Sequence, residues 1–292
     1  MEIAGIRERA VLVKPNISCW EGKKIDRGLS REVAREKGAK ADDALAATKK
    51  LLWAKELDEI IKLRNKIRQY VDENTVAWMH RGPRLLASVR LLEFMKGWTE
   101  LKDQYYRKAE ELEQVYHQRR EESMQMQGEE LASLSDYPAS LIGLFDCSLD
   151  IMPIPDVSDI RLDLDEENVK RVQEQMEERF KVMFSNSVAD VWARIRDVLQ
   201  ALADKMRVYG QDDGVRRKMH DSILGNICQL VDLMPGLNVT QDPELDEMTD
   251  KMRKAFCSLA VENLRQDAML RQDVADEAEG MLAVVKSKVV AG

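Results

Sequence analysis

Four aspartates in the middle of the chain are the residues whose types and spacing best suit metal chemistry. Asp146 and Asp150 alternate with apolar residues, and Asp159 and Asp163 do so again after a proline-containing turn. Carboxylates on one face of a sheet can hold Mg²⁺ for phosphoryl chemistry. They equally suit the solvated face of an antiparallel sheet, with Arg161 as the neutralising neighbour. No His and no metal-ligand motif lie nearby in the sequence, so we expect no bound metal and no cofactor. A metal-dependent enzyme that uses these aspartates is therefore only our third choice of function, after an interaction protein and a nucleic-acid-binding protein.

Patterns of nucleophilic chemistry are missing from the sequence. It contains no Gly-x-Ser-x-Gly element, no phosphate-binding glycine loop and no His-Glu-x-x-His motif. The three histidines are isolated from one another along the chain. We therefore expect a protein that is not an enzyme.

The N-terminal region is basic, whereas the rest of the chain is acidic. Residues 1–70 contain 17 Lys or Arg and 11 Asp or Glu, and the remainder contains 28 and 42. This asymmetry favours head-to-tail association or contact with a polyanion, although ordinary solvated helix faces explain it equally well. Residues 30–38 also resemble the first helix and turn of a helix-turn-helix. The residues that would bind nucleic acid are Lys23, Lys24, Arg27, Arg31, Lys49 and Lys50.

The cysteines and the hydropathy pattern indicate the compartment. Cys19, Cys147, Cys228 and Cys257 are scattered, without the close pairs typical of zinc sites, so we expect reduced, buried thiols. No run of 18 apolar residues and no secretory signal occur. These observations predict a cytoplasmic protein without membrane association.

The elements that must position these residues are dominated by one long helix at 165–209. Its apolar residues recur at three- and four-residue steps, and no Pro or Gly interrupts them. A helix of that length spans roughly 65 Å and needs partners along it. The helix predicted at 84–128 is expected to be its antiparallel mate.

The second half of the helix at 84–128 loses its apolar stripe and becomes mainly charged. Such a segment is expected to project from the core or to await a partner. The residues proposed to bind a partner are Glu110, Glu113, Arg119, Arg120 and Glu121.

Other segments complete a mainly α-helical fold, a long-helix antiparallel bundle with one small antiparallel β-sheet. Alternating residues predict strands near 10–20, 145–152 and 159–164. Helices are expected at 30–38 and 42–71, and most of the five tryptophans should be core. We expect a single domain over 1–292, with a subdivision into a basic helical half (1–140) and a β-hairpin plus helical half (141–292) as the alternative.

Several stretches together resemble a family of uncharacterised proteins of tailed bacteriophages, prophages and bacteria, known only as a domain of unknown function. They are residues 10–26, Tyr137-Pro138, 153–164, 237–245 and 265–270. The chain departs from the family pattern where Val76-Ala-Trp78 replaces a Leu-Pro-Trp-like element. The resemblance implies a phage or phage-like origin, a location in the host cytoplasm and, for some members, neighbouring genes for a MoxR-like AAA+ ATPase. It implies no catalytic residues.

These observations favour a non-catalytic interaction or assembly protein that forms a homo-oligomer through its long helices. As a further partner, ranked after a second copy of the chain, the family resemblance implies an AAA+ ATPase or another phage or host protein. The alternative function is nucleic-acid binding by the basic N-terminal region, whose signature is an affinity that falls steeply with salt.

Overall fold

A computed structural model describes residues 4–41, 43–79, 82–156, 166–209 and 219–289. Two compact units make up the chain, and both are assembled from separated segments. Unit 1 comprises residues 1–14, 72–94 and 151–292, and unit 2 comprises residues 15–71 and 95–150. The predicted subdivision into residues 1–140 and 141–292 stays a prediction. The two compact units differ from it, because each one combines segments from both sides of residue 140.

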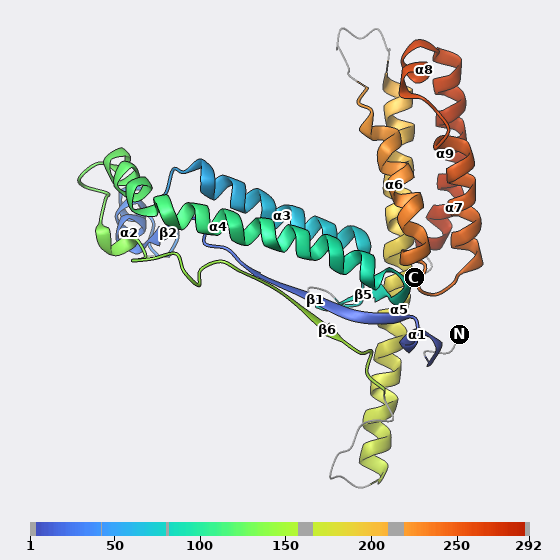
Figure 1. Ribbon diagram of the computed structural model, residues 1–292, viewed down its shortest axis with the longest axis horizontal. Coiled ribbons are helices and arrows are strands. Elements are labelled where there is room, and N and C mark those ends of the chain that lie inside the picture. The colour runs from blue at the N-terminus through green and yellow to red at the C-terminus, as the bar shows by residue number, and fades with distance from the viewer. Residues whose placement is uncertain (1–3, 42, 80–81, 157–165, 210–218, 290–292) are drawn as a thin grey trace. The chain divides into compact units, whose positions relative to one another are not determined.

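The described part of the chain is mainly α-helical, as predicted, with a four-stranded sheet and a two-stranded ribbon (Figure 1). The helices are α1 (Ala4–Arg7), α2 (Arg27–Glu36), α3 (Lys55–Asn74), α4 (Leu91–Gln127), α5 (Glu166–Val208), α6 (Ser222–Leu237), α7 (Pro243–Phe256), α8 (Val261–Gln266) and α9 (Ala268–Val289). The strands are β1 (Ala10–Ser18), β2 (Lys23–Asp26), β3 (Ala47–Lys50), β4 (Val76–Ala77), β5 (Arg84–Ala87) and β6 (Asp146–Met152).

The sheet has the strand order β4-β5-β1-β6, and it confirms the predicted strands near 10–20 and 145–152. Strand β1 pairs antiparallel with β5, so that Ala10 lies opposite Ala87 and Val13 opposite Arg84. The strand predicted at 159–164 lies outside the described residues. The helix predicted to begin at residue 84 instead starts at Leu91, because residues 84–87 satisfy their backbone groups in the middle of this sheet.

Unit 1 is built around α5, which has 43 residues and confirms the long helix predicted at 165–209. The prediction that the helix at 84–128 is its mate is wrong, because α5 packs mainly along α9. Ile195, Leu199 and Leu202 of α5 are fully buried, as are Ala275 and Ala278 of α9. Small alanines let the backbones of α5 and α9 approach closely. The charged second half of α4 has no such pair of small residues.

An edge strand of the sheet is held by α5 within the same unit. The Ala77 backbone N–H donates to Asp190 Oδ2 at 3.2 Å, and Ser187 Oγ donates to the Ala77 carbonyl at 2.6 Å. Strand β4 lies at the edge of the sheet, so its outer backbone groups have no partner strand. The two bonds to α5 satisfy the N–H and carbonyl groups of Ala77 at this edge.

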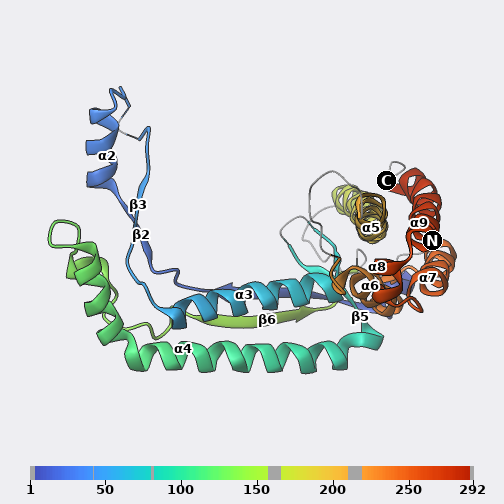
Figure 2. The same ribbon diagram turned by 90° about the horizontal axis from the view of Figure 1, so that it is seen from above.

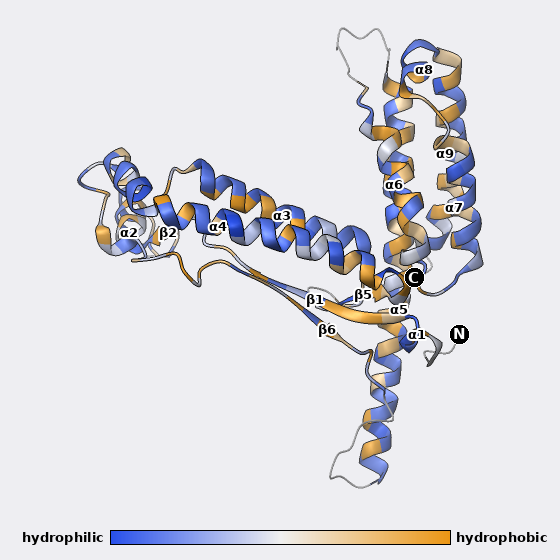
Figure 3. Cartoon of the chain, in the orientation of Figure 1, coloured by the Kyte–Doolittle hydropathy of each residue, from blue (hydrophilic) through white to orange (hydrophobic). Residues whose placement is uncertain are grey.

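Unit 2 contains α3 and α4 side by side (Figures 1 and 2). Glu56 pairs with Arg119 at 2.8 Å and Glu59 with Lys108 at 3.2 Å, so the two helices run antiparallel. Figure 3 shows apolar residues interspersed with hydrophilic ones along both helices, as expected of amphipathic helices.

The helix predicted at 42–71 is wrong in its first part. Residues 47–50 form β3, and α3 starts only at Lys55. Leu51 and Leu52 follow the strand and are both 1% exposed. The segment is rich in Ala, Leu and Lys, which favour a helix, but pairing with β2 and burial of these two leucines outweigh that local preference.

Candidate functional site

The two-stranded ribbon brings together four of the six basic residues predicted to bind nucleic acid. Strands β2 and β3 pair antiparallel, with Lys23 opposite Lys50 and Lys24 opposite Lys49. Directly opposed residues share one face of a ribbon, and successive residues alternate between faces. Each face of the ribbon therefore carries one pair of opposed lysines. The two ammonium groups of a pair repel each other unless anions lie nearby.

The inner face of the ribbon has its own carboxylates. Asp136 binds Lys24 at 2.7 Å and Lys49 at 2.6 Å, and Asp26 binds Lys49 at 2.9 Å. The hydrogen bonds to Asp136 and Asp26 raise the pKa of Lys49. Lys24 and Lys49 lower the pKa of Asp136. The hydrogen bond from the Leu29 N–H and, to a smaller extent, the one from Lys49 lower the pKa of Asp26. Lys49, Asp136 and Asp26 therefore stay ionised at neutral pH, which suits binding rather than proton transfer.

Three local contacts fix the ribbon to its surroundings in unit 2. Asp26 caps α2 by accepting from the Leu29 N–H at 3.0 Å, and Ser30 Oγ accepts from the Ala47 N–H at 2.9 Å. At the other end of the ribbon, Gln127 Nε2 donates to the Lys50 carbonyl at 2.6 Å. The helix α2 and the end of α4 therefore hold both ends of β3.

The outer face of the ribbon is exposed. It carries Lys23 and Lys50, together with Thr48 and Ile25, and the Ile25 side chain is 59% exposed. In the described chain no carboxylate lies within ion-pair distance of either lysine of this face.

An indole ring lies beside this outer face. Lys50 Nζ lies 5.3 Å from the centre of the Trp53 ring, which is 38% exposed. The Trp53 backbone N–H donates to the buried Ser123 Oγ at 3.1 Å, which anchors the tryptophan to α4. Sequence reasoning placed most tryptophans in the core, although the position of Trp53 three residues after a lysine pair was a usable signal.

The remaining two basic candidates lie on α2. Arg27 and Arg31 are four residues apart, hence on one side of the helix, and both are exposed. Arg27 also lines a hollow of about 500 Å³ with Lys24, Lys49, Asp26 and Asp136. Three cations and two carboxylates leave this hollow with a net positive charge.

The residues predicted to bind a partner on α4 are mostly engaged within the chain. Glu113 accepts from Ser140 Oγ at 2.7 Å and from the Leu141 N–H at 2.8 Å. Arg119 binds Glu56, as described above, and Arg120 lies 5.9 Å from the Tyr116 ring centre.

The charged half of α4 was predicted to project from the core or to await a partner. Instead, Leu112 and Tyr116 are fully buried. Glu121 is exposed. Glu110 is also exposed and lines a hollow of about 460 Å³, with Ile142, which is 83% exposed, on its rim.

The aspartates considered for metal binding are only partly placed by the structure. Asp146 of β6 accepts from the Tyr106 hydroxyl at 2.9 Å, and Asp150 accepts from Asn16 Nδ2 at 2.9 Å. Asp159 and Asp163 lie outside the described residues. Among the residues that are described, no group of three or more His, Cys, Asp or Glu could hold a metal ion.

The expectation of reduced thiols is wrong for two of the four cysteines. Cys228 of α6 and Cys257, the residue after α7, form a disulfide across 29 residues. Cys19 and Cys147 are free, and burial raises the pKa of Cys147 to about 11, which makes its thiolate scarce. The spacing of cysteines could not reveal the bridge, because packing of α6 against α7 brings the pair together. Disulfides persist in oxidising compartments, and cytoplasmic localisation stays a prediction.

Comparisons with known proteins leave the site to be interpreted from its own geometry. No family model, no curated protein and no solved structure matches this chain. No described helix is both long and apolar enough to cross a membrane.

Proposed function

We propose that this chain is a non-catalytic binding protein whose β2–β3 ribbon holds single-stranded nucleic acid. The observation that carries the proposal is the register of the ribbon, which opposes Lys23 to Lys50 on an exposed face beside Trp53. Action inside a phage-infected or prophage-bearing cell, and association with an AAA+ ATPase, rest on the family resemblance alone and stay predictions.

The charge distribution supports a polyanionic ligand. Between residues 23 and 50 the chain has nine Lys or Arg and five Asp or Glu, within a protein whose net charge is −8. The inner lysines have carboxylate partners, so the uncompensated charge belongs to Lys23 and Lys50 of the ribbon and to Arg27 and Arg31 of α2. Phosphate groups spaced along a strand would relieve the repulsion between the opposed outer lysines.

The indole supports a single strand rather than a duplex. Bases of a single strand can stack on an aromatic ring, whereas paired bases inside a duplex cannot reach it. Trp53 is anchored through its backbone N–H, which leaves its exposed ring beside the lysine pair. A lysine over the ring adds to the attraction for a stacked base and its phosphate.

The test is fluorescence anisotropy of a labelled oligothymidylate at several salt concentrations. We expect the Lys23→Ala/Lys50→Ala variant to bind at least about tenfold more weakly at low salt. The slope of log K against log salt should fall by about 1.4, since each phosphate contact on a single strand contributes about 0.7. Trp53→Ala should weaken binding by about 1–3 kcal/mol, and Trp53→Phe by less.

A matched control removes two other exposed lysines of the same unit. Lys62→Ala/Lys66→Ala on α3 makes the same change in net charge away from the ribbon. The proposal is wrong if the native protein does not bind the oligonucleotide at low salt, or if this control weakens binding as much as the ribbon variant does. A labelled duplex that binds more tightly than the single strand would contradict the role of Trp53.

A further inference from the structure

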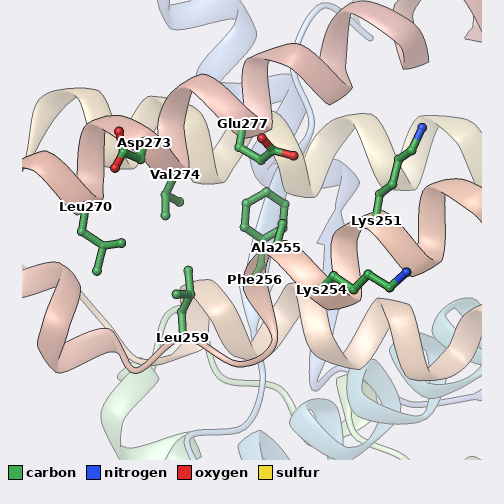
Figure 4. Close-up of a pocket in the computed structure, with 9 residues that line it drawn as sticks. All are labelled: Lys251, Lys254, Ala255, Phe256, Leu259, Leu270, Asp273, Val274 and Glu277. Atoms are coloured by element: carbon green, nitrogen blue, oxygen red, sulfur yellow. The ribbon is translucent and has the colours of Figure 1, made fainter.

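A groove in unit 1 lies between α7 and α9 and has an apolar floor. Its volume is about 500 Å³, and the floor is formed by Ala255, Phe256, Leu259, Leu270 and Val274. Figure 4 shows these side chains between the two helices. Leu259 and Leu270 are only half-buried, so the floor is open to an apolar partner.

The two rims of this groove carry opposite charges. Lys251 and Lys254 of α7 form one rim, and Asp273 and Glu277 of α9 form the other (Figure 4). Each pair is three or four residues apart and so lies on one side of its helix. In the part of the chain that is described, no ion pair joins the rims, and Lys251 binds only Glu247, an exposed neighbour one turn earlier.

The exposed side of α9 continues the groove in both directions. Met269 is 77% exposed and Val284 is 49% exposed, and helical spacing places both on the side of Asp273 and Glu277. Gly280 lies on the same side in mid-helix, where glycine costs about 1 kcal/mol relative to alanine. A Cβ atom at Gly280 would meet no other segment of the described chain within 4 Å. Packing within the chain therefore does not explain the glycine, whereas a closely approaching second helix would.

We infer that this surface binds a second copy of the same chain. In a twofold symmetric interface one patch meets itself, so the patch must be complementary to its own rotated image. A twofold axis that runs along the helices brings the lysine rim of each copy onto the acidic rim of the other. An axis that crosses the helices in the plane of the interface would oppose like charges. The charge pattern therefore selects a parallel arrangement of the two α9 helices.

The test is the oligomeric state, measured by sedimentation velocity over a range of protein concentrations. We expect a dimer for the native chain. Because like charges would then face each other, Lys251→Glu/Lys254→Glu should weaken dimerisation on the order of a hundredfold. Asp273→Lys/Glu277→Lys should do the same, and the chain with all four substitutions should dimerise again.

The control is Lys62→Glu/Lys286→Glu, which makes the same change in charge at exposed positions outside the groove. Circular dichroism and the urea midpoint would establish that each variant is folded. A native chain that stays monomeric at high concentration would overturn the inference, and so would a dimer that survives the lysine reversal. Failure of the fourfold variant to recover, when it is folded, would overturn the proposed symmetry.

Discussion

Replacing Asp136 by asparagine tests both the stability and the charge balance of the lysine ribbon. The Asp136 side chain is 9% exposed and binds Lys49, which is 12% exposed, and Lys24, which is 47% exposed. Breaking a buried ion pair costs about 3–5 kcal/mol, whereas an exposed pair contributes about 0–1 kcal/mol. Lys49 keeps Asp26 at 2.9 Å. We therefore expect the free energy of unfolding at pH 7 to fall by about 1–2 kcal/mol.

The effect should depend on pH with a definite sign. The lysines hold the folded-state pKa of Asp136 below its ordinary value of 3.8. The stabilisation is therefore fully present above that value and is lost as the pH falls through the lower folded-state pKa. Urea unfolding of both proteins at several pH values should show a difference at pH 7 that shrinks towards zero below the folded-state pKa.

The same substitution should strengthen binding of a single-stranded oligonucleotide. It frees Lys24 from its carboxylate and adds one positive charge, so the salt slope should steepen by about 0.7. Asp103→Asn, at an exposed position of α4, is the matched control. It should change neither the free energy of unfolding nor the salt dependence of oligonucleotide binding. The reasoning about this ion-pair cluster would be refuted if Asp136→Asn were as stable as the native protein at pH 7. It would also be refuted if the variant's lower free energy of unfolding persisted unchanged in strong acid.

Three further substitutions or treatments test the packing of each unit. Ile195→Ala, at a fully buried position of α5, should lower the unfolding free energy by about 2–5 kcal/mol in urea titrations, whereas a loss below 1 kcal/mol would mean that the α5–α9 core is loose. Ser123→Ala leaves the Trp53 N–H without its acceptor, and we expect a loss of about 1–3 kcal/mol with a shift in tryptophan emission. Reduction of the Cys228–Cys257 disulfide should lower stability by about 3 kcal/mol in thermal unfolding, and a reductant effect that persists in Cys228→Ser would exclude the bridge as its cause.

Some elements could be predicted because their signal is local. The apolar residues of α5 recur at helical spacing over 43 residues without Pro or Gly, and this periodicity survives in any packed environment. The alternation over residues 10–18 predicted β1 in the same way. The charge imbalance of the N-terminal region likewise required only a count of residues.

Other features were decided by pairings between distant residues. Residues 47–50 became a strand because β2 lies beside them, although the surrounding sequence suits a helix. Asp136 lies 112 residues from Lys24 and gave no sign in the sequence that it belongs to the ribbon. Its own neighbours form a short turn, which says nothing about the lysines that it neutralises.

The sequence by itself determined the helical class, the length of α5 and the six basic candidates. Only the tertiary structure decided that α9 is the partner of α5, that four lysines share one ribbon, and that α7 and α9 carry opposite charges across a groove. Periodicity states which face of a helix is apolar. It does not state which other apolar face will cover it, because that choice depends on the fit of side chains from distant segments.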